Sequence, residues 1–160
     1  MGKKMARYGL LTALAMVLSW VESLVPFSAA MPGMKLGLGN LVVVFALYRM
    51  TARDAAALSL ARVALVSAAF GNAFSFVYSL AGAALSLAVM VLLKRTGRFS
   101  VVGVSVAGGV CHNLGQLLVA MAALGTGRLA WYLPALLVSG VAAGVAIGAV
   151  GGVLTERIKI

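Results

Sequence analysis

The sequence has few groups that could hold a metal or form a disulfide. Its only acidic side chains are Glu22, Asp54 and Glu156, which excludes chemistry that needs paired aspartates around a metal ion. Cys111 is the single cysteine, so no disulfide within the chain and no cysteine metal cluster can form, and we expect a small core residue there. We therefore expect no metal site, no cofactor and no catalysis.

Charge is also scarce. Only 10% of the 160 residues are charged, whereas 63% are hydrophobic and the mean hydropathy is +1.10. A soluble protein of this size cannot hide so much apolar surface from water, so the composition excludes a soluble globular enzyme and a disordered chain. We expect residues 1–160 to form a single integral membrane domain, long enough for about six spans of ~20 residues.

Apolar runs divide the chain into six segments. The basic start and residues 28–30 resemble a signal peptide, but the length of the first run and the presence of Trp20 and Glu22 favour a transmembrane helix. The second run is short and follows a connector rich in glycine and proline, which predicts a short or broken helix. The sequence thus predicts an all-α membrane protein of six transmembrane helices, with apolar runs at 8–27, 41–48, 55–70, 74–93 and 101–124. A sixth run follows the interface residues Trp131 and Tyr132 and ends near residue 154.

The net charge of +10 follows from basic residues that cluster between these runs. Such clusters indicate topology and contact with anionic lipid head groups, not nucleic acid binding. With the N-terminus inside, Lys35 and Arg128 fall outside and Arg62 lies within the membrane. Both termini are then cytoplasmic, together with the remaining basic residues Lys3, Lys4, Arg7, Arg49, Arg53, Lys94, Arg95, Arg98, Arg157 and Lys159.

Small residues recur at every fourth position in the last two runs. Residues four apart share a helix face, and smooth faces let helix backbones approach closely in lipid. We expect these faces to pack against each other, with docking of another membrane subunit as the alternative. The two faces are Gly103, Ala107, Cys111 and Gly115, and Gly140, Gly144, Gly148 and Gly152.

Polar residues inside a membrane are costly and are therefore candidates for function. From their depth along the helices, we expect a group of them to converge on one cavity open to the outside, with Arg62 supporting it from below. The candidate substrate-binding residues are Glu22, Lys35, Asn40, Asn72, His112, Asn113 and Gln116.

Each candidate has a structural alternative. Glu22 can pair with Arg62 or with a helix end, Arg62 can be a structural tether, and His112 can be a hydrogen-bonded core residue. Lys35 stands between glycines next to a helix start, a setting that suits anion capture, although anchoring to outer head groups is the competing interpretation.

The glycines of residues 33–39 do not form a nucleotide-binding loop, because the Gly-Lys-Ser/Thr order of the P-loop is absent. If the protein moves a molecule uphill, the energy must come from a partner or an ion gradient.

Four segments together resemble the bacterial Gx transporter family, also called heptaprenyl diphosphate synthase component I. They are residues 32–40 (PGMKLGLGN), 60–63 (LARV), 79–82 (SLAG) and 103–116 (GVSVAGGVCHNLGQ). The family is grouped with the S components of energy-coupling-factor transporters. The resemblance implies a six-helix bundle in the bacterial cell membrane that binds a vitamin-like molecule from outside. It also implies a transmembrane coupling subunit and two cytoplasmic ATPases as partners.

The resemblance places Lys35, Asn40, Arg62, His112, Asn113 and Gln116 at family motif positions. S components often carry a small-residue docking face on the first helix, and Ala15 and Ser19 are an imperfect version of it. The synthase name does not imply catalysis, because prenyl elongation needs two aspartate-rich motifs and Asp54 is the only aspartate.

Three hypotheses follow. The first is the substrate-binding component of a small-molecule uptake transporter, energised by partners, with a ligand that carries an anionic group. The second is a membrane accessory subunit in isoprenoid or quinone synthesis. The third is an ion-coupled carrier working alone, with Glu22 and His112 as relay groups.

Overall fold

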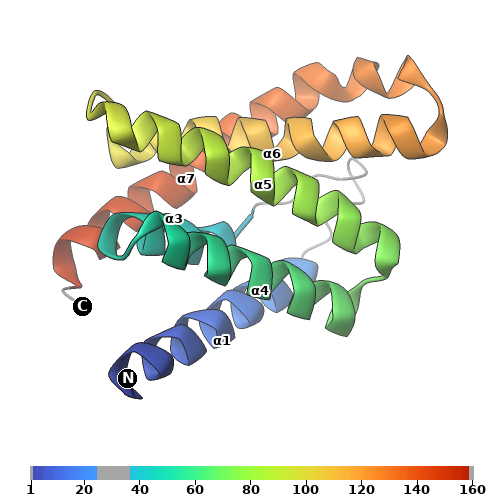
Figure 1. The fold of residues 1–160 in the computed structure, drawn as a ribbon. Coiled ribbons are helices and arrows are strands. Elements are labelled where there is room, and N and C mark those ends of the chain that lie inside the picture. Colours follow the sequence, from blue (N-terminus) through green and yellow to red (C-terminus); the bar gives the residue numbers. More distant parts are fainter. Residues whose placement is uncertain (1, 25–36, 159–160) are drawn as a thin grey trace.

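The computed structural model describes residues 2–24 and 37–158, and their regular structure is entirely helical (Figure 1). The longest helices form two groups, with α5, α6 and α7 on one side and α1 and α4 on the other. The elements are α1 (Gly2–Leu24), α3 (Asn40–Arg49), α4 (Ala52–Phe70), α5 (Ala73–Thr96), α6 (Val101–Leu124), the 3-10 helix η1 (Gly127–Tyr132) and α7 (Leu133–Arg157).

Helix ends follow local capping chemistry. Thr51 and Asp54 form a reciprocal capping box at the start of α4, and the Ser100 hydroxyl accepts from Gly103 N at the start of α6. α5 and α6 end at glycines with left-handed backbone, Gly97 at φ 67° and Gly125 at φ 60°. The prediction of a short second helix is confirmed, because α3 has only 10 residues.

Three segments of the described chain are long and apolar enough to cross a membrane: Ala73–Thr96, Val101–Leu124 and Gly127–Arg157. Large side chains such as Val138 and Leu118 are exposed on them, at 70% and 58%, which suits contact with lipid. α3 is apolar but shorter, and α4 carries Arg62 near its middle. The fold is that of an all-helical membrane protein, and six crossings remain a prediction.

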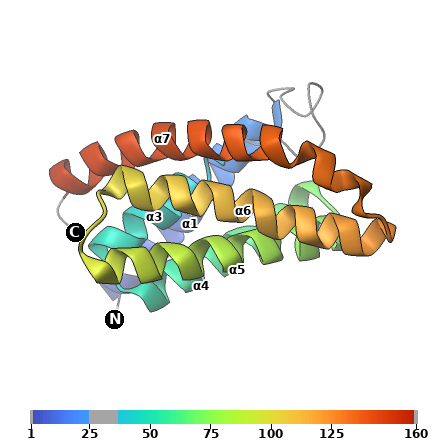
Figure 2. The ribbon, with the colours of Figure 1, turned by 90° about the horizontal axis from the view of Figure 1, so that it is seen from above.

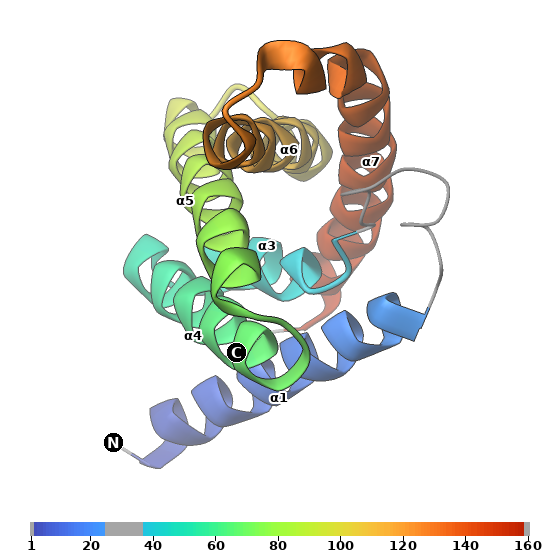
Figure 3. The same cartoon turned by 90° about the vertical axis from the view of Figure 1, so that its right-hand side faces the viewer.

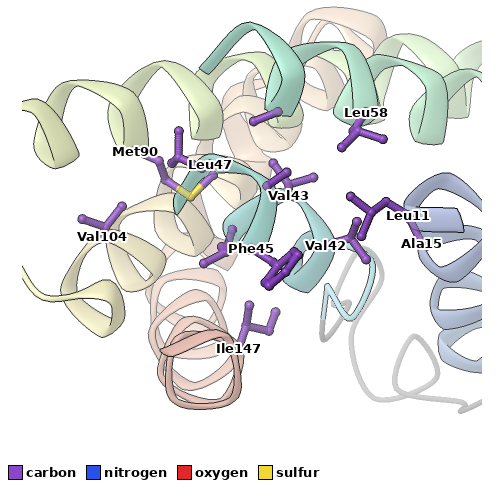
Figure 4. Packing of buried hydrophobic residues seen from close by; sticks show 13 residues of the cluster. Leu11, Ala15, Val42, Val43, Phe45, Leu47, Leu58, Met90, Val104 and Ile147 are labelled. Carbon is purple, nitrogen blue, oxygen red and sulfur yellow. The ribbon is translucent and has the colours of Figure 1, made fainter. Parts of the chain in front are cut away.

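α3 lies inside the bundle and forms the centre of the core (Figure 3). The residues from Val42 to Leu47 are all buried, with exposures from 0% to 6%. Figure 4 shows Val42, Val43, Phe45 and Leu47 surrounded by side chains of the other helices. These surrounding side chains are Leu11 and Ala15 of α1, Leu58 of α4, Met90 of α5, Val104 of α6 and Ile147 of α7.

α6 and α7 run side by side and touch through glycines (Figure 2). A Cβ added to Gly144 would lie 2.5 Å from Val106 Cα, and one added to Gly140 would lie 3.0 Å from Gly109 O. Contact through the α7 glycines is therefore confirmed for Gly140, Gly144 and Gly148, the last of which faces Val102.

The prediction of which side of α6 faces α7 is wrong. α7 meets Val102, Ser105, Val106, Gly109 and Val110. The atoms nearest to a Cβ added at Gly103 belong to Phe99 and Ser100, which precede it in the chain. Gly115 faces α5, where an added Cβ would lie 2.8 Å from Ala81 O. Glycine permits close approach on either side of a helix, so α6 has tight contacts with both neighbours and a fourfold stripe does not show which side meets α7.

Basic side chains tie several helices together at one end of the bundle. Lys4 Nζ lies 3.2 Å from Asp54 Oδ1, which also accepts a hydrogen bond from the Tyr8 hydroxyl. Lys94 donates to Leu47 O, and Arg49 donates to Ile158 O at 2.9 and 2.7 Å. The first and last described residues also lie at this end (Figures 1 and 2), which is the arrangement that two termini on one membrane face require.

Candidate ligand-binding cavity

A cavity of about 290 Å³ lies between the helices. Every α-helix of the described residues contributes to its wall, which combines glycines, apolar residues and polar groups. Six of the polar residues singled out in the sequence line it: Glu22, Asn40, Arg62, His112, Asn113 and Gln116. The structure therefore brings most of the predicted site together, and whether these residues bind a ligand stays a prediction.

α6 supplies three of these polar side chains. Gln116 is 2% exposed and makes no side-chain hydrogen bond to the rest of the described chain. Asn113 is different, because its Nδ2 donates to Leu136 O at 2.7 Å and to Ser139 Oγ at 3.2 Å. Asn113 thus joins α6 to α7, while Gln116 keeps its amide for the cavity.

The approach of α5 fixes the position of the α6 residues. A Cβ added to Gly82 would lie 2.8 Å from both Gln116 Cγ and His112 O. Only glycine permits so close an approach of the two helices, so α5 packs directly against the turn of α6 that carries His112 and Gln116. The two side chains are placed by backbone packing and not by a loop.

Glu22 and Asn40 approach the cavity from α1 and from the start of α3. One Glu22 carboxylate oxygen accepts a hydrogen bond from Gly37 N, which fixes the end of α1 to the turn before α3. Asn40 N donates to Gly37 O at 2.7 Å, and Gly37 has a left-handed φ of 70°, which closes this turn. The predicted contact of Glu22 with a helix end is therefore present.

Arg62 lines the cavity and does not only support it from below. The residue is 8% exposed, and its Nε has no hydrogen-bond partner in the described chain. No ion pair within 4.0 Å joins it to Glu22; between described residues, Lys4 and Asp54 form the ion pair present. The predicted alternative of a direct Glu22–Arg62 pair is not what the structure has.

The two remaining predicted site residues are Lys35 and Asn72. Lys35 lies outside the described residues. Asn72 is exposed and does not line the cavity. Its side chain accepts from Ser75 N at 2.8 Å, and Ser75 Oγ accepts from Asn72 N at 2.9 Å, so Asn72 caps α5. Depth along the chain placed Asn72 correctly near a helix end, but local capping uses its side chain.

Sequence reasoning missed the hydroxyl groups of the cavity. Serine is common in membrane helices and gives little signal by itself, because its hydroxyl can bond back to its own helix. Ser79 and Ser86 are seven residues apart on one face of α5, and that spacing was a usable signal. The cavity serines are Ser19, Ser23, Ser67, Ser79, Ser86 and Ser105.

The small-residue face of α1 packs inside the protein. Ala15 is 2% exposed and belongs to the hydrophobic core, and Ser19 lines the cavity. The opposite side of α1 exposes large apolar residues, among them Leu10 at 71% and Val17 at 54%. The predicted docking face at Ala15 and Ser19 is therefore not a free surface.

These features define a class: a helical membrane protein with a cavity between its helices that is lined by both polar and apolar groups. The family model described as heptaprenyl diphosphate synthase component I matches residues 11–154. The chain belongs to this family, as the sequence motifs predicted. No curated protein matches the chain. No solved structure matches it either.

Proposed function

We propose that the protein is the substrate-binding transmembrane component of a small-molecule uptake transporter of the energy-coupling-factor type, energised by partner subunits. The observation that carries this proposal is the cavity of about 290 Å³, to which every α-helix of the described part of the chain contributes and which polar side chains help to line. Polar groups are costly inside an apolar bundle unless protein, water or a ligand satisfies them.

The size of the cavity favours a small ligand. Its volume is near the lower limit of ~300 Å³ for small-molecule sites. Its hydroxyl, amide, carboxylate and guanidinium groups suit a polar molecule of few atoms. We expect an anionic group on the ligand, which Lys35 was predicted to meet, and a flat or polar part near His112, Asn113 and Gln116.

Six crossings with both termini in the cytoplasm complete the proposal. Lys4, Arg49 and Lys94 form an ion pair or hydrogen bonds at one end of the bundle, and this topology places that end on the cytoplasmic side. Glu22 and Asn40 lie toward the opposite ends of α1 and α3, so the cavity would face outward.

The second candidate is a non-catalytic membrane accessory subunit of heptaprenyl diphosphate synthase, and the family description favours it. The cavity would then receive the diphosphate head group, because a chain of seven isoprene units is too large for it and would extend into lipid. A carrier that works alone, with Glu22 and His112 as relay groups, is the third candidate.

Binding by purified variants tests the proposal. Once the copurifying small molecule is identified, Lys35→Ala should weaken its binding by about 1.5–3 kcal/mol in calorimetry, the usual size for a hydrogen bond to a charged group. Gln116→Leu should weaken binding without unfolding the protein, and Asn72→Ser, which keeps a capping residue outside the cavity, should bind normally. Equal affinity in all three variants would place the site elsewhere.

Transport and lipid analysis separate the three candidates. Uptake into proteoliposomes that appears only after coupling and ATPase subunits are added supports the first. A copurifying long-chain prenyl diphosphate supports the second. Uptake driven by an ion gradient without partners supports the third.

A further inference from the structure

Arg62 and Glu22 place opposite charges on one cavity without forming an ion pair. Arg62 projects from the middle of α4 and is 8% exposed, and Glu22 lies near the end of α1. Both line the cavity, and no nitrogen of Arg62 comes within 4.0 Å of a Glu22 oxygen. A buried guanidinium is costly, and Glu22 acts on that of Arg62 through its charge without a direct ion pair.

The surroundings of Arg62 hold its guanidinium at the start of α3. Gly39 is buried, and a Cβ added there would lie 2.6 Å from Arg62 Nη1 and 2.5 Å from Ser19 Oγ. The missing side chain at Gly39 therefore provides the space that the guanidinium and the hydroxyl occupy. Arg62 Nε makes no hydrogen bond to the described chain, so the guanidinium group retains a donor for another acceptor.

The helix start adds a favourable field but few donors. Asn40 N already donates to Gly37 O at 2.7 Å, and Leu41 N donates to Leu38 O at 3.1 Å. The positive end of the α3 dipole still favours negative charge at this place. Arg62 and Ser19 supply the side-chain donors that an oxyanion needs.

Glu22 gives the opposite preference at another part of the wall. One of its carboxylate oxygens accepts from Gly37 N, which fixes the side chain at the cavity. A carboxylate there attracts a donor or a cationic group and repels a second anionic group. The part of the cavity at Arg62 therefore favours an anionic group, and the part at Glu22 disfavours one.

We propose that Arg62, with Ser19, binds a single oxyanion group of the ligand while Glu22 binds a donor or cationic group and excludes polyanions. The ligand class is a small acid, carboxylate or phosphate, that also carries an amino group or another hydrogen-bond donor. This inference rests on the proposed binding function, and it argues against a diphosphate as the preferred ligand of the cavity.

Inorganic phosphate and inorganic pyrophosphate, added at constant ionic strength, serve as probes. The thermal stability of the detergent-purified full chain is measured against probe concentration for the parent and four variants. We expect phosphate to raise the midpoint of unfolding of the parent, because a ligand that binds the folded state stabilises it. Arg62→Lys should raise the half-maximal phosphate concentration at least about tenfold, because lysine keeps the positive charge but lacks the planar set of guanidinium donors.

Two further variants act on the same subsite without removing Arg62. Gly39→Ala should also weaken the phosphate response, because its Cβ displaces Arg62 Nη1 and Ser19 Oγ. Glu22→Gln should move the response in the opposite direction and improve pyrophosphate more than phosphate, while its amide oxygen still accepts from Gly37 N. Gly152→Ala is the matched control, because its nearest neighbour is Val101 Cβ at 4.0 Å.

The opposite signs of Arg62→Lys and Glu22→Gln are the result that supports the proposal. Equal responses of parent, Gly39→Ala and Glu22→Gln would overturn it, even if Arg62→Lys fails to fold. If the parent copurifies with a small molecule but no variant changes the phosphate or pyrophosphate response, the binding function stands and the charge assignment is wrong. If nothing copurifies and neither probe changes the unfolding midpoint of the parent, both the charge assignment and the proposed binding function are wrong.

Discussion

Gly82 of α5 lies against the backbone carbonyl of His112 in α6, with room for no side chain: an added Cβ would lie 2.8 Å from His112 O. This contact holds the turn of α6 that carries Gln116 at the cavity wall. The geometry of the candidate site therefore depends on glycine packing between two helices, and its first consequence concerns stability.

Gly82→Ala should destabilise the protein, because backbone atoms of α6 cannot move aside as the end of a side chain can. We expect a loss of about 1–3 kcal/mol, the usual cost of overpacking. Thermal unfolding in detergent measures it, with Gly152→Ala as the control. Equal melting temperatures for the two variants would contradict the close α5–α6 contact.

Gly144→Leu and Gly148→Leu should disrupt the α6–α7 contact. An added Cβ would already lie 2.5 Å from Val106 Cα at Gly144 and 2.7 Å from Val102 Cα at Gly148. A leucine would force the backbones apart, so both variants should fold poorly. Gly152→Leu belongs to the same fourfold series, but a Cβ added there meets Val101 Cβ only at 4.0 Å, so this variant should be better tolerated. Size-exclusion profiles and melting temperatures compare the three.

The predicted topology places the two ends of the bundle on opposite sides of the membrane. Single cysteines at positions 53 and 98, in a variant that lacks Cys111, should react with a membrane-impermeant reagent only from the cytoplasmic side. A cysteine in place of Arg128, which is exposed in η1, should react from outside. Labelling of position 128 from the cytoplasm would refute six crossings with both termini inside.

Stability should fall in acid because of Asp54. The Tyr8 hydroxyl, which donates to its carboxylate, holds the pKa of Asp54 well below its ordinary value, with help from Thr51 and Lys4. A carboxyl whose pKa is lower in the folded state stabilises that state above the unfolded pKa. This stabilisation is lost as the pH falls below about 4 toward the folded pKa.

The melting temperatures of the parent and of Asp54→Asn should therefore differ at pH 7, and the difference should begin to shrink as the pH falls from about 4 to about 3. Tyr8→Phe removes the largest cause of the shift and should show a smaller dependence on pH than the parent. A constant difference between parent and Asp54→Asn over this range would show that the Asp54 charge is not linked to folding.

Apolar runs predicted most of the helices. The bounds predicted for α6, 101–124, agree with the structure, because Ser100 and Gly125 provide capping signals at both ends. The short α3 followed from its eight-residue apolar run. Helix phase was harder to predict: Gly103 and Gly115 share a spacing with the α7 glycines, yet α7 meets the face that contains Val102 and Val106.

The candidate site shows the same limit. Depth along each helix correctly grouped Glu22, His112 and Gln116, because depth depends only on sequence position. Depth does not show which way a side chain points, so Asn72 was included although it caps α5, and Arg62 was placed below the cavity that it lines. Direction around a helix depends on packing between helices, which a single sequence does not display.

The central claim is that the cavity holds a small polar molecule, and native mass spectrometry of the protein released from detergent tests it most directly. The parent should carry a bound small molecule of defined mass, and Gln116→Leu should lose it while remaining folded. Asn72→Ser should retain it, because Asn72 lies outside the cavity. A parent without any bound molecule, or equal retention by Gln116→Leu, would contradict the account.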